Sequence, residues 1–334
     1  MNVLPWHKSE FEQILARKAR LPHAILLHGR QGIGKGAFAG ALAQTLLCEN
    51  PEQSGIACGQ CAACHWFSAG AHPDFQRIEP ANVAETGAEE GGDKKASQQI
   101  TIEQIRMLPD FIGISSHRGG AKVILIHPAE ALNASAANAL LKSLEEPPAR
   151  TYFLLVSHRP YSLLPTIKSR CQQIVLQGPP PEAAIAWLKS QGMADPELAL
   201  AQTGNSPLIA LQLDDTEYWR QRNAFLKGMT AAGFDALALA EQVRDHPVVQ
   251  VLGWLQKWSY DLISHKFLGT IRYNPDYGSA LAATAARLDA LPMLRFHRDL
   301  VRLQRIVSHP LNPRLFIEQL LISYAELVQP QRAG

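Results

Sequence analysis

The chain has 334 residues, of which 46% are hydrophobic and 19% are charged, and its formal net charge is +2. This is the composition of a folded protein, and the small net charge argues against a strongly basic domain that wraps DNA, although local phosphate contacts remain open. No apolar run approaches the roughly 20 residues that span a bilayer, and the first residues lack the layout of a secretion signal, so we expect a cytoplasmic protein.

The first 176 residues alternate short apolar runs with helical patterns, which predicts a parallel α/β sheet with right-handed crossovers. One stretch interrupts this alternation. Residues Ala81–Gln99 are rich in Ala, Gly, Glu and Lys and have almost nothing to bury, so we expect a flexible surface insertion. The predicted buried strands are Ala24–His28, Phe75–Ile78, Val123–Ile126, Tyr152–Val156 and Ile174–Leu176.

A stiff break in the chain follows the last predicted strand, where residues 178–181 read Gly-Pro-Pro-Pro. Residues 177–213 have helical periodicity and predict a small helical domain. Residues 214–334 are mostly helical in pattern, with amphipathic runs such as Val248–Leu262 and Met293–Ile306. The predicted layout is an α/β domain over residues 1–176, then a small helical domain, then an all-helical C-terminal domain.

A glycine-rich loop follows the first predicted strand and leads into a helical pattern. Residues Gly29 to Lys35 read G-x-x-x-x-G-K, with a further glycine at Gly32. Glycines let backbone N–H groups close around phosphates, and a lysine at this place reaches the outer phosphates of a nucleotide. Gly29, Gly32, Gly34 and Lys35 are therefore candidate nucleotide ligands. Gly36 follows where Ser or Thr would supply the hydroxyl for Mg²⁺.

Acidic residues are also missing after the third predicted strand, where an active P-loop enzyme carries a carboxylate for Mg²⁺. The chain continues with His127-Pro128 instead, and Glu130 comes too late to replace the missing group. We therefore expect no ATP hydrolysis by the isolated chain. Passive binding of ATP or ADP remains open, and so does an interpretation in which the glycine loop is only a tight strand-to-helix turn.

Four of the five cysteines lie close together in the sequence. Two C-x-x-C pairs overlap, and glycines between them allow tight turns. Four thiolates at this spacing predict a closed tetrahedral Zn²⁺ site with a structural role, because no coordination position is left for a substrate. An iron–sulfur cluster is the competing interpretation. The predicted ligands are Cys48, Cys58, Cys61 and Cys64.

Two further motifs follow each other in the α/β domain. Residues Asn138–Pro148 read Asn-Ala-Leu-Leu-Lys-Ser-Leu-Glu-Glu-Pro-Pro, and Ser169-Arg170-Cys171 precede the last predicted strand. Together they closely resemble the signature of bacterial DNA polymerase clamp-loader subunits of the AAA+ superfamily. The resemblance implies that Ser169 and Arg170 lie at a subunit edge and that Arg170 is an arginine finger for the neighbouring ATP site. Ser157 then takes the family's polar sensor position.

Within that family the resemblance is to the delta-prime subunits, which do not hydrolyse ATP themselves, and it runs from about Leu21 to Leu327. Leu208 falls where an active relative has the arginine that senses the γ-phosphate. The resemblance also implies a four-cysteine zinc module, a helical lid over residues 177–213, and a C-terminal collar that includes the helix over Leu315–Leu321, although that helix could equally pack only within its own domain.

The implied partners are the gamma or tau motor subunits and the delta subunit of DNA polymerase III. Contact with the sliding clamp would be indirect or weak, and primer–template DNA would be reached through the complex. Two alternatives remain at this point. One is an ATP-hydrolysing motor subunit of the same complex, and the other is a zinc-containing P-loop module outside replication.

Overall fold

The computed structural model describes residues 3–81, 98–117, 120–213, 215–304, 306–307 and 312–329. The chain forms two compact units, Met1–Pro179 and Pro180–Gly334, and the division falls inside the proline run. The predicted insertion Ala81–Gln99 lies for the most part outside the described residues.

The first unit is built on a five-stranded sheet in which every strand pair is parallel, as the alternation of strands and helices predicted. The strand order is β2-β3-β4-β1-β5. Four predicted strands are confirmed to within a residue at each end. The fifth was placed too late, because β5 lies at an edge of the sheet and has no buried residue to mark it. The strands are β1 (Ala24–His28), β2 (Phe75–Ile78), β3 (Lys122–Ile126), β4 (Thr151–Ser157) and β5 (Gln172–Val175).

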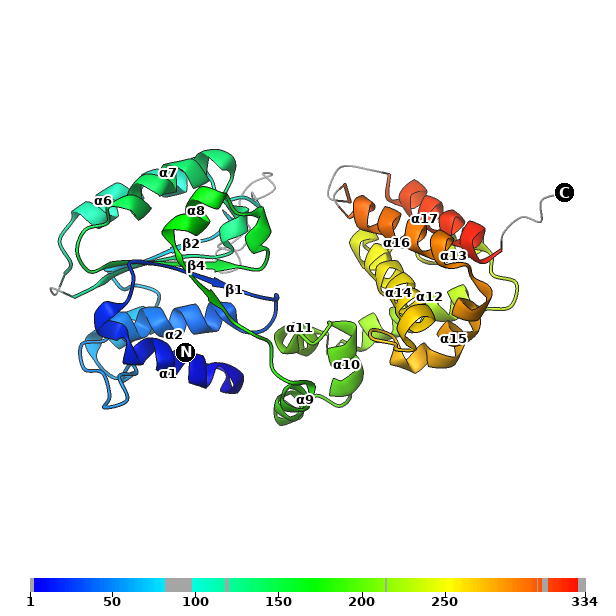
Figure 1. Ribbon diagram of the computed structural model, residues 1–334, viewed down its shortest axis with the longest axis horizontal. Coiled ribbons are helices and arrows are strands. Elements are labelled where there is room, and N and C mark those ends of the chain that lie inside the picture. The colour runs from blue at the N-terminus through cyan, green and yellow to red at the C-terminus, as the bar shows by residue number, and fades with distance from the viewer. Residues whose placement is uncertain are drawn as a thin grey trace. The chain divides into compact units, whose positions relative to one another are not determined.

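Helices cover both faces of this sheet. Figure 1 shows α1 and α2 on one face and α6, α7 and α8 on the other. Alternate residues of each central strand enter opposite cores, so that Leu27 packs with α2 while Leu26 packs with α7. The helices of this unit are η1 (Pro5–His7), α1 (Lys8–Ala16), η2 (Lys18–Arg20), α2 (Lys35–Leu47), α3 (Ala62–Ser68), α5 (Ile102–Arg106), α6 (Leu108–Gly113), η4 (Ala129–Ala131), α7 (Ala134–Glu145), η5 (Pro160–Ser162) and α8 (Pro165–Arg170).

The second unit is helical throughout its described residues. A small apolar cluster forms around Ala184, Leu188 and Leu200, and a larger one around Trp258 and Tyr324. The long helix α14 continues past the predicted end at Leu262, to a left-handed Gly269. The helices are α9 (Pro181–Ser190), α10 (Pro196–Gln202), α11 (Pro207–Gln212), α12 (Thr216–Thr230), α13 (Ala236–Gln242), α14 (Val248–Leu268), η6 (Pro275–Tyr277), α15 (Gly278–Arg287), α16 (Ala290–Leu303) and α17 (Pro313–Val328).

The last helix begins as its sequence indicates. Pro313 occupies the first turn of α17, and the Asn312 side chain accepts hydrogen bonds from the backbone N–H groups of Arg314 and Leu315. Within the described ranges, no helix combines the length and the apolarity that crossing a membrane requires.

Candidate functional site

The glycine-rich loop connects β1 to α2 and depends on its glycines. A Cβ atom on Gly29 would lie 2.2 Å from the carbonyl oxygen of Leu176, so no larger residue fits there. Gly32 and Gly34 have φ angles of +77° and +99°, which favour glycine, and Gly34 is the N-cap of α2. The loop therefore has the strand–loop–helix geometry that the sequence predicted.

Lys35 contacts its own loop. Its side chain is buried, and Nζ donates hydrogen bonds to the carbonyl oxygens of Gly29, at 2.8 Å, and of Arg30. Burial lowers the pKa of Lys35 to about 8, and the negative charge of Glu130 partly opposes this shift. The ammonium group that would meet phosphate oxygens is thus already bound by two backbone carbonyls.

Neutral imidazoles face the position where a magnesium site would lie. A Cβ atom on Gly36 would be 3.4 Å from Cε1 of His127, so the first helical turn and the end of β3 lie side by side. Burial, and next the neighbouring His158, lowers the pKa of His127 to about 4. The two imidazole rings pack edge to face with their centroids 5.3 Å apart. His127 and His158 therefore present neutral imidazole nitrogens here rather than negatively charged oxygens.

Two other groups complete this part of the unit. Glu130 accepts a hydrogen bond from the backbone N–H of His158 at 2.9 Å, which fixes the turn after β4. Ser157 is fully buried, and its hydroxyl oxygen accepts a hydrogen bond from the backbone N–H of Arg159. The sequence offered no reason to select His158, because its partner His127 follows a different strand, β3, and only the sheet brings the two together.

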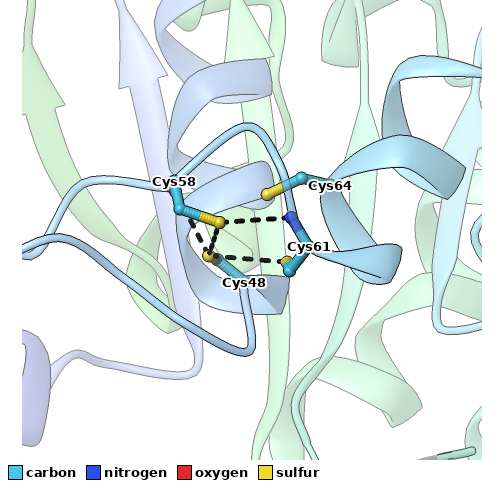
Figure 2. A group of neighbouring side chains, drawn as sticks. All are labelled: Cys48, Cys58, Cys61 and Cys64. Atoms are coloured by element: carbon cyan, nitrogen blue, oxygen red, sulfur yellow. Dashed lines mark hydrogen bonds between the residues drawn. The ribbon is translucent and has the colours of Figure 1, made fainter.

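The four predicted metal ligands come together. The Sγ atoms of Cys48, Cys58, Cys61 and Cys64 all lie within 4.8 Å of one another (Figure 2). Cys48 follows the last residue of α2, and Cys64 lies on α3. Backbone N–H groups of Cys58 and Cys61 point at cluster sulfurs at 3.3 Å, which stabilises negative charge on them. This cluster can hold a metal ion, and all four of its candidate ligands are cysteine sulfurs.

The two family motifs also meet in space. Arg170 is the last residue of α8, and its guanidinium forms an ion pair with the carboxylate of Glu145, the last residue of α7. Its side chain is 34% exposed and that of Glu145 is 49% exposed. Arg170 Nη1 also donates to the carbonyl oxygen of Thr166, and the exposed Ser169 hydroxyl donates to the same oxygen. The guanidinium therefore lies at the surface of its unit.

The helix α7 explains why Glu145 lies beside α8. Asn133 caps α7 by accepting the N–H of Ala136, and Leu140 and Leu144 are buried beneath it. Pro147 disfavours helix in the residue before it, so α7 stops and presents Glu145 to α8. The helix that carries the motif Asn138–Pro148 begins before it, at Ala134, and ends within it, at Glu145. The pairing of Glu145 with Arg170 was not predicted.

Comparison with known proteins bears on the whole chain. Residues 6–180 match a family model described as "DNA polymerase III, delta subunit", and residues 216–326 match its C-terminal counterpart. A Pseudomonas aeruginosa protein named DNA polymerase III subunit delta-prime is 36% identical over 98% of this chain and 99% of its own length. The chain belongs to the DNA polymerase III delta-prime subunit family. An Escherichia coli delta-prime subunit is 29% identical over 99% of the chain and 97% of its own length.

Solved structures resemble this delta-prime family member more distantly. A Thermotoga maritima protein related to the DNA polymerase III gamma subunit aligns over 96% of this chain and 99% of its own, with a TM-score of 0.45 and 19% identity. The Bacillus subtilis clamp-loader delta protein aligns over 95% and 99%, with a TM-score of 0.36 and 9% identity. The match to the first family model ends at residue 180, beside the division between the two compact units.

Proposed function

We propose that the chain is the delta-prime subunit of a DNA polymerase III clamp loader and that it completes a neighbouring subunit's ATP site without hydrolysing ATP itself. The observation that carries this proposal is full-length similarity to delta-prime subunits, in a chain whose own phosphate loop lacks magnesium ligands. Its role in loading the sliding clamp onto primed DNA would be that of a fixed element in the complex.

The absence of turnover follows from the loop. Gly36 brings no hydroxyl, and His127 brings an imidazole of low pKa where a carboxylate would bind the metal. Lys35 would have to leave the carbonyls of Gly29 and Arg30 before it could bind a phosphate. Leu208, on α11, has no positive charge with which to sense a γ-phosphate. Weak nucleotide binding through Gly29, Gly32, Gly34 and Lys35 stays compatible with these contacts.

The weak ion pair of Arg170 supports its proposed role as an arginine finger. Within the described residues, Arg170 forms its ion pair with the exposed carboxylate of Glu145, and an exposed ion pair is worth about 0–1 kcal/mol. A neighbour's γ-phosphate carries more charge and matches the planar guanidinium fork, so it can replace that carboxylate at small cost. Glu145 would then act before assembly, by holding the side chain extended along the unit's edge.

The metal proposed for the cysteine cluster is Zn²⁺ with a structural role. Tetrahedral coordination with Zn–S bonds of about 2.3 Å separates the sulfurs by about 3.8 Å. The Sγ atom of Cys48 lies 3.6 Å from that of Cys58 and 3.9 Å from that of Cys61. An iron–sulfur cluster places several iron and sulfide atoms between its cysteines and needs more room than this. The ion would tie the end of α2 to the start of α3.

The helical residues after the α/β domain would also serve the complex. Residues 177–213 would be the lid, and residues 214–334 would contribute the collar that joins the chain to its gamma or tau motor subunits and to the delta subunit. Primer–template DNA and the sliding clamp would be reached through that complex. The chain would work in the cytoplasm, as a component of the polymerase holoenzyme.

The experiment is reconstitution from purified subunits. We expect the lone chain to hydrolyse ATP at background rate, to form a stable complex with motor and delta subunits in size-exclusion chromatography, and to raise the DNA-stimulated ATPase of the motor subunits. Robust magnesium-dependent turnover by the lone chain would instead favour a motor subunit. Failure to enter the complex would remove the replication assignment altogether.

A further inference from the structure

The second unit contains a cavity of about 610 Å³ that the proposed function does not use. Its walls come from helices α10, α11, α12, α14 and α16 and from the loop that follows α14. The volume lies within the range of about 300–1,000 Å³ that is typical of small-molecule sites. Aromatic and aliphatic side chains dominate the lining, among them Tyr218, Trp254, Tyr260 and Leu213, and one ammonium group, on Lys257, joins them.

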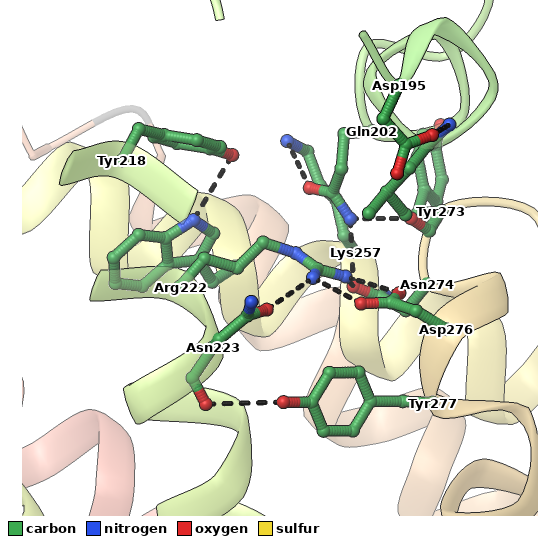
Figure 3. A network of polar contacts seen from close by, with 12 residues as sticks. Asp195, Gln202, Tyr218, Arg222, Asn223, Lys257, Tyr273, Asn274, Asp276 and Tyr277 are labelled. Atoms are coloured by element: carbon green, nitrogen blue, oxygen red, sulfur yellow. Dashed lines mark hydrogen bonds and ion pairs between the residues drawn. The ribbon is translucent and has the colours of Figure 1, made fainter. Parts of the chain in front are cut away.

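A neighbouring cation shows how this unit normally treats buried charge. Arg222 on α12 is fully buried, and Asp276 binds its two terminal nitrogens at 2.6 and 2.9 Å (Figure 3). Asn274 and Asn223 accept further hydrogen bonds from the same guanidinium. The Arg222 charge is therefore neutralised within the unit, as a buried charge requires.

Lys257 has no such partner. Its ammonium makes one hydrogen bond in the described part of the chain, to Oε1 of Gln202 at 3.3 Å, and no ion pair there. Figure 3 shows it beside Gln202 and on the side of the network away from Asp276. Lys257 is half-buried, and a neutral amide oxygen compensates its positive charge only in part.

The carboxylate that could neutralise Lys257 is occupied elsewhere. Asp261 lies one turn further along α14, at the spacing where ion pairs usually form. Its oxygens instead accept hydrogen bonds from the backbone N–H groups of Arg272, Tyr273 and Asn274 and from the Asn274 side chain. Asp261 therefore holds the loop after α14, and Lys257 remains available on the cavity wall.

We propose that this cavity is a binding site for a carboxylate carried on a flat apolar group, with Lys257 as its counter-ion. The aromatic walls match the apolar group, and a single ammonium matches a single negative charge. A phosphate group carries up to about two negative charges at neutral pH, whereas the cavity lining supplies one cation. The carboxylate could belong to a free aromatic acid or to a Glu side chain beside an aromatic residue in a partner's peptide.

The electrostatics agree with this geometry. Burial, and next the positive charge of Arg222, lowers the pKa of Lys257 to about 8. A carboxylate against the ammonium would favour its charged form and raise that pKa again. The histidine of the lining, His297 on α16, bonds Ser259 through Nδ1, and burial lowers its pKa, so it adds no positive charge at neutral pH.

The test uses the indole N–H signal of Trp254, because this group donates to the Tyr218 hydroxyl at the cavity wall. The probes are 3-phenylpropanoate, its neutral amide, and a short peptide with Glu between two aromatic residues, together with its Gln counterpart. We expect saturable shifts of the Trp254 signal with one of the acids, with a dissociation constant on the order of 1 mM for a ligand of this size. The acid that binds identifies the source of the carboxylate.

The variants separate charge from packing. Lys257→Met should weaken binding by about tenfold or more, and Lys257→Arg should restore it. Lys227→Met, which removes an exposed lysine of α12, serves as the matched control and should bind normally. Three results would each overturn the proposal. The first is equal binding of an acid and its amide, and the second is equal binding by Lys257→Met and by the unchanged chain. The third is no binding of either acid at a concentration about ten times the expected dissociation constant.

Discussion

Removing the metal is expected to release the segment between Cys48 and Cys64 without unfolding the sheet. The dozen residues from Glu49 to Gln60 are mostly exposed. Ordering their backbone costs roughly 1–2 kcal/mol per residue, or about 12–24 kcal/mol together. The cluster offers little apolar burial in return, because its buried members are Cys61, Ala63 and Cys64, which contribute a few kcal/mol.

The remaining cost, about 10 kcal/mol or more, is similar to what a structural zinc ion supplies in small zinc domains, about 10–16 kcal/mol. The two cores that flank the sheet contain large side chains such as Phe38 and Phe153 and none of the four cluster cysteines. The loss of structure should therefore stay local.

The assay is amide hydrogen exchange with and without a strong chelator, together with elemental analysis. We expect one zinc per chain, and rapid exchange over residues 49–64 after chelation while β1 and β4 keep their protection. Cys64→Ser should behave like the chelated protein, whereas Cys171→Ser, which removes the buried thiol outside the cluster, should keep the metal. Unchanged protection of residues 49–64 in metal-free protein would refute the reasoning, and iron in place of zinc would refute the metal assignment.

Three further outcomes follow from the first unit. Gly36→Ser should change the free energy of unfolding by no more than about 0.5 kcal/mol in urea titrations, because the new Cβ contacts His127 at 3.4 Å, and it should still show no ATPase; magnesium-dependent turnover would mean that the missing carboxylate is dispensable. The pKa of His127 lies at about 4 in the folded chain against an ordinary 6.5, so the unfolded state binds its proton first. His127 alone should therefore lower the free energy of unfolding by about 3 kcal/mol as the pH drops from above 6.5 to 4, and His127→Asn should remove about that much of the fall measured in urea titrations across this range. Glu145→Gln should lower the free energy of unfolding by at most about 1 kcal/mol in thermal denaturation, since the ion pair is exposed. It should also lower the ATPase of the reconstituted complex, though by less than loss of Arg170 does. An ATPase equal to that of the unchanged complex would remove the positioning role of Glu145.

The central strands were predictable because their signal is local. In β1, β3 and β4 nearly every residue is buried on both faces of a parallel sheet, which gives short continuous apolar runs between polar turns. The edge strand β5 has mostly exposed residues, so the buried Leu176 just after it drew the prediction too far along the chain. The four-cysteine cluster was predictable for the same local reason, since its members lie within 17 positions.

Contacts between distant segments could not be predicted. The pairing of Arg170 with Glu145 depends on where α7 stops and how α8 packs beside it, and the packing of His127 on His158 depends on the strand order. Lys257 on α14 reads as an ordinary surface lysine in the sequence. Only the fold shows that Asp261, its natural partner, is bound to a loop instead.

The most direct measurement of the central claim is the DNA-stimulated ATPase of a complex reconstituted with Arg170→Ala. Arg170 is partly exposed and is paired with an exposed carboxylate, so the variant should fold and assemble normally. An arginine finger is worth about 10³–10⁵ in turnover at the site it serves, and the ATPase of the whole complex should fall by about tenfold or more. Lys168→Ala, on the same short helix, is the matched control and should keep its rate. An Arg170→Ala complex that assembles and hydrolyses ATP at the unchanged rate would contradict the account.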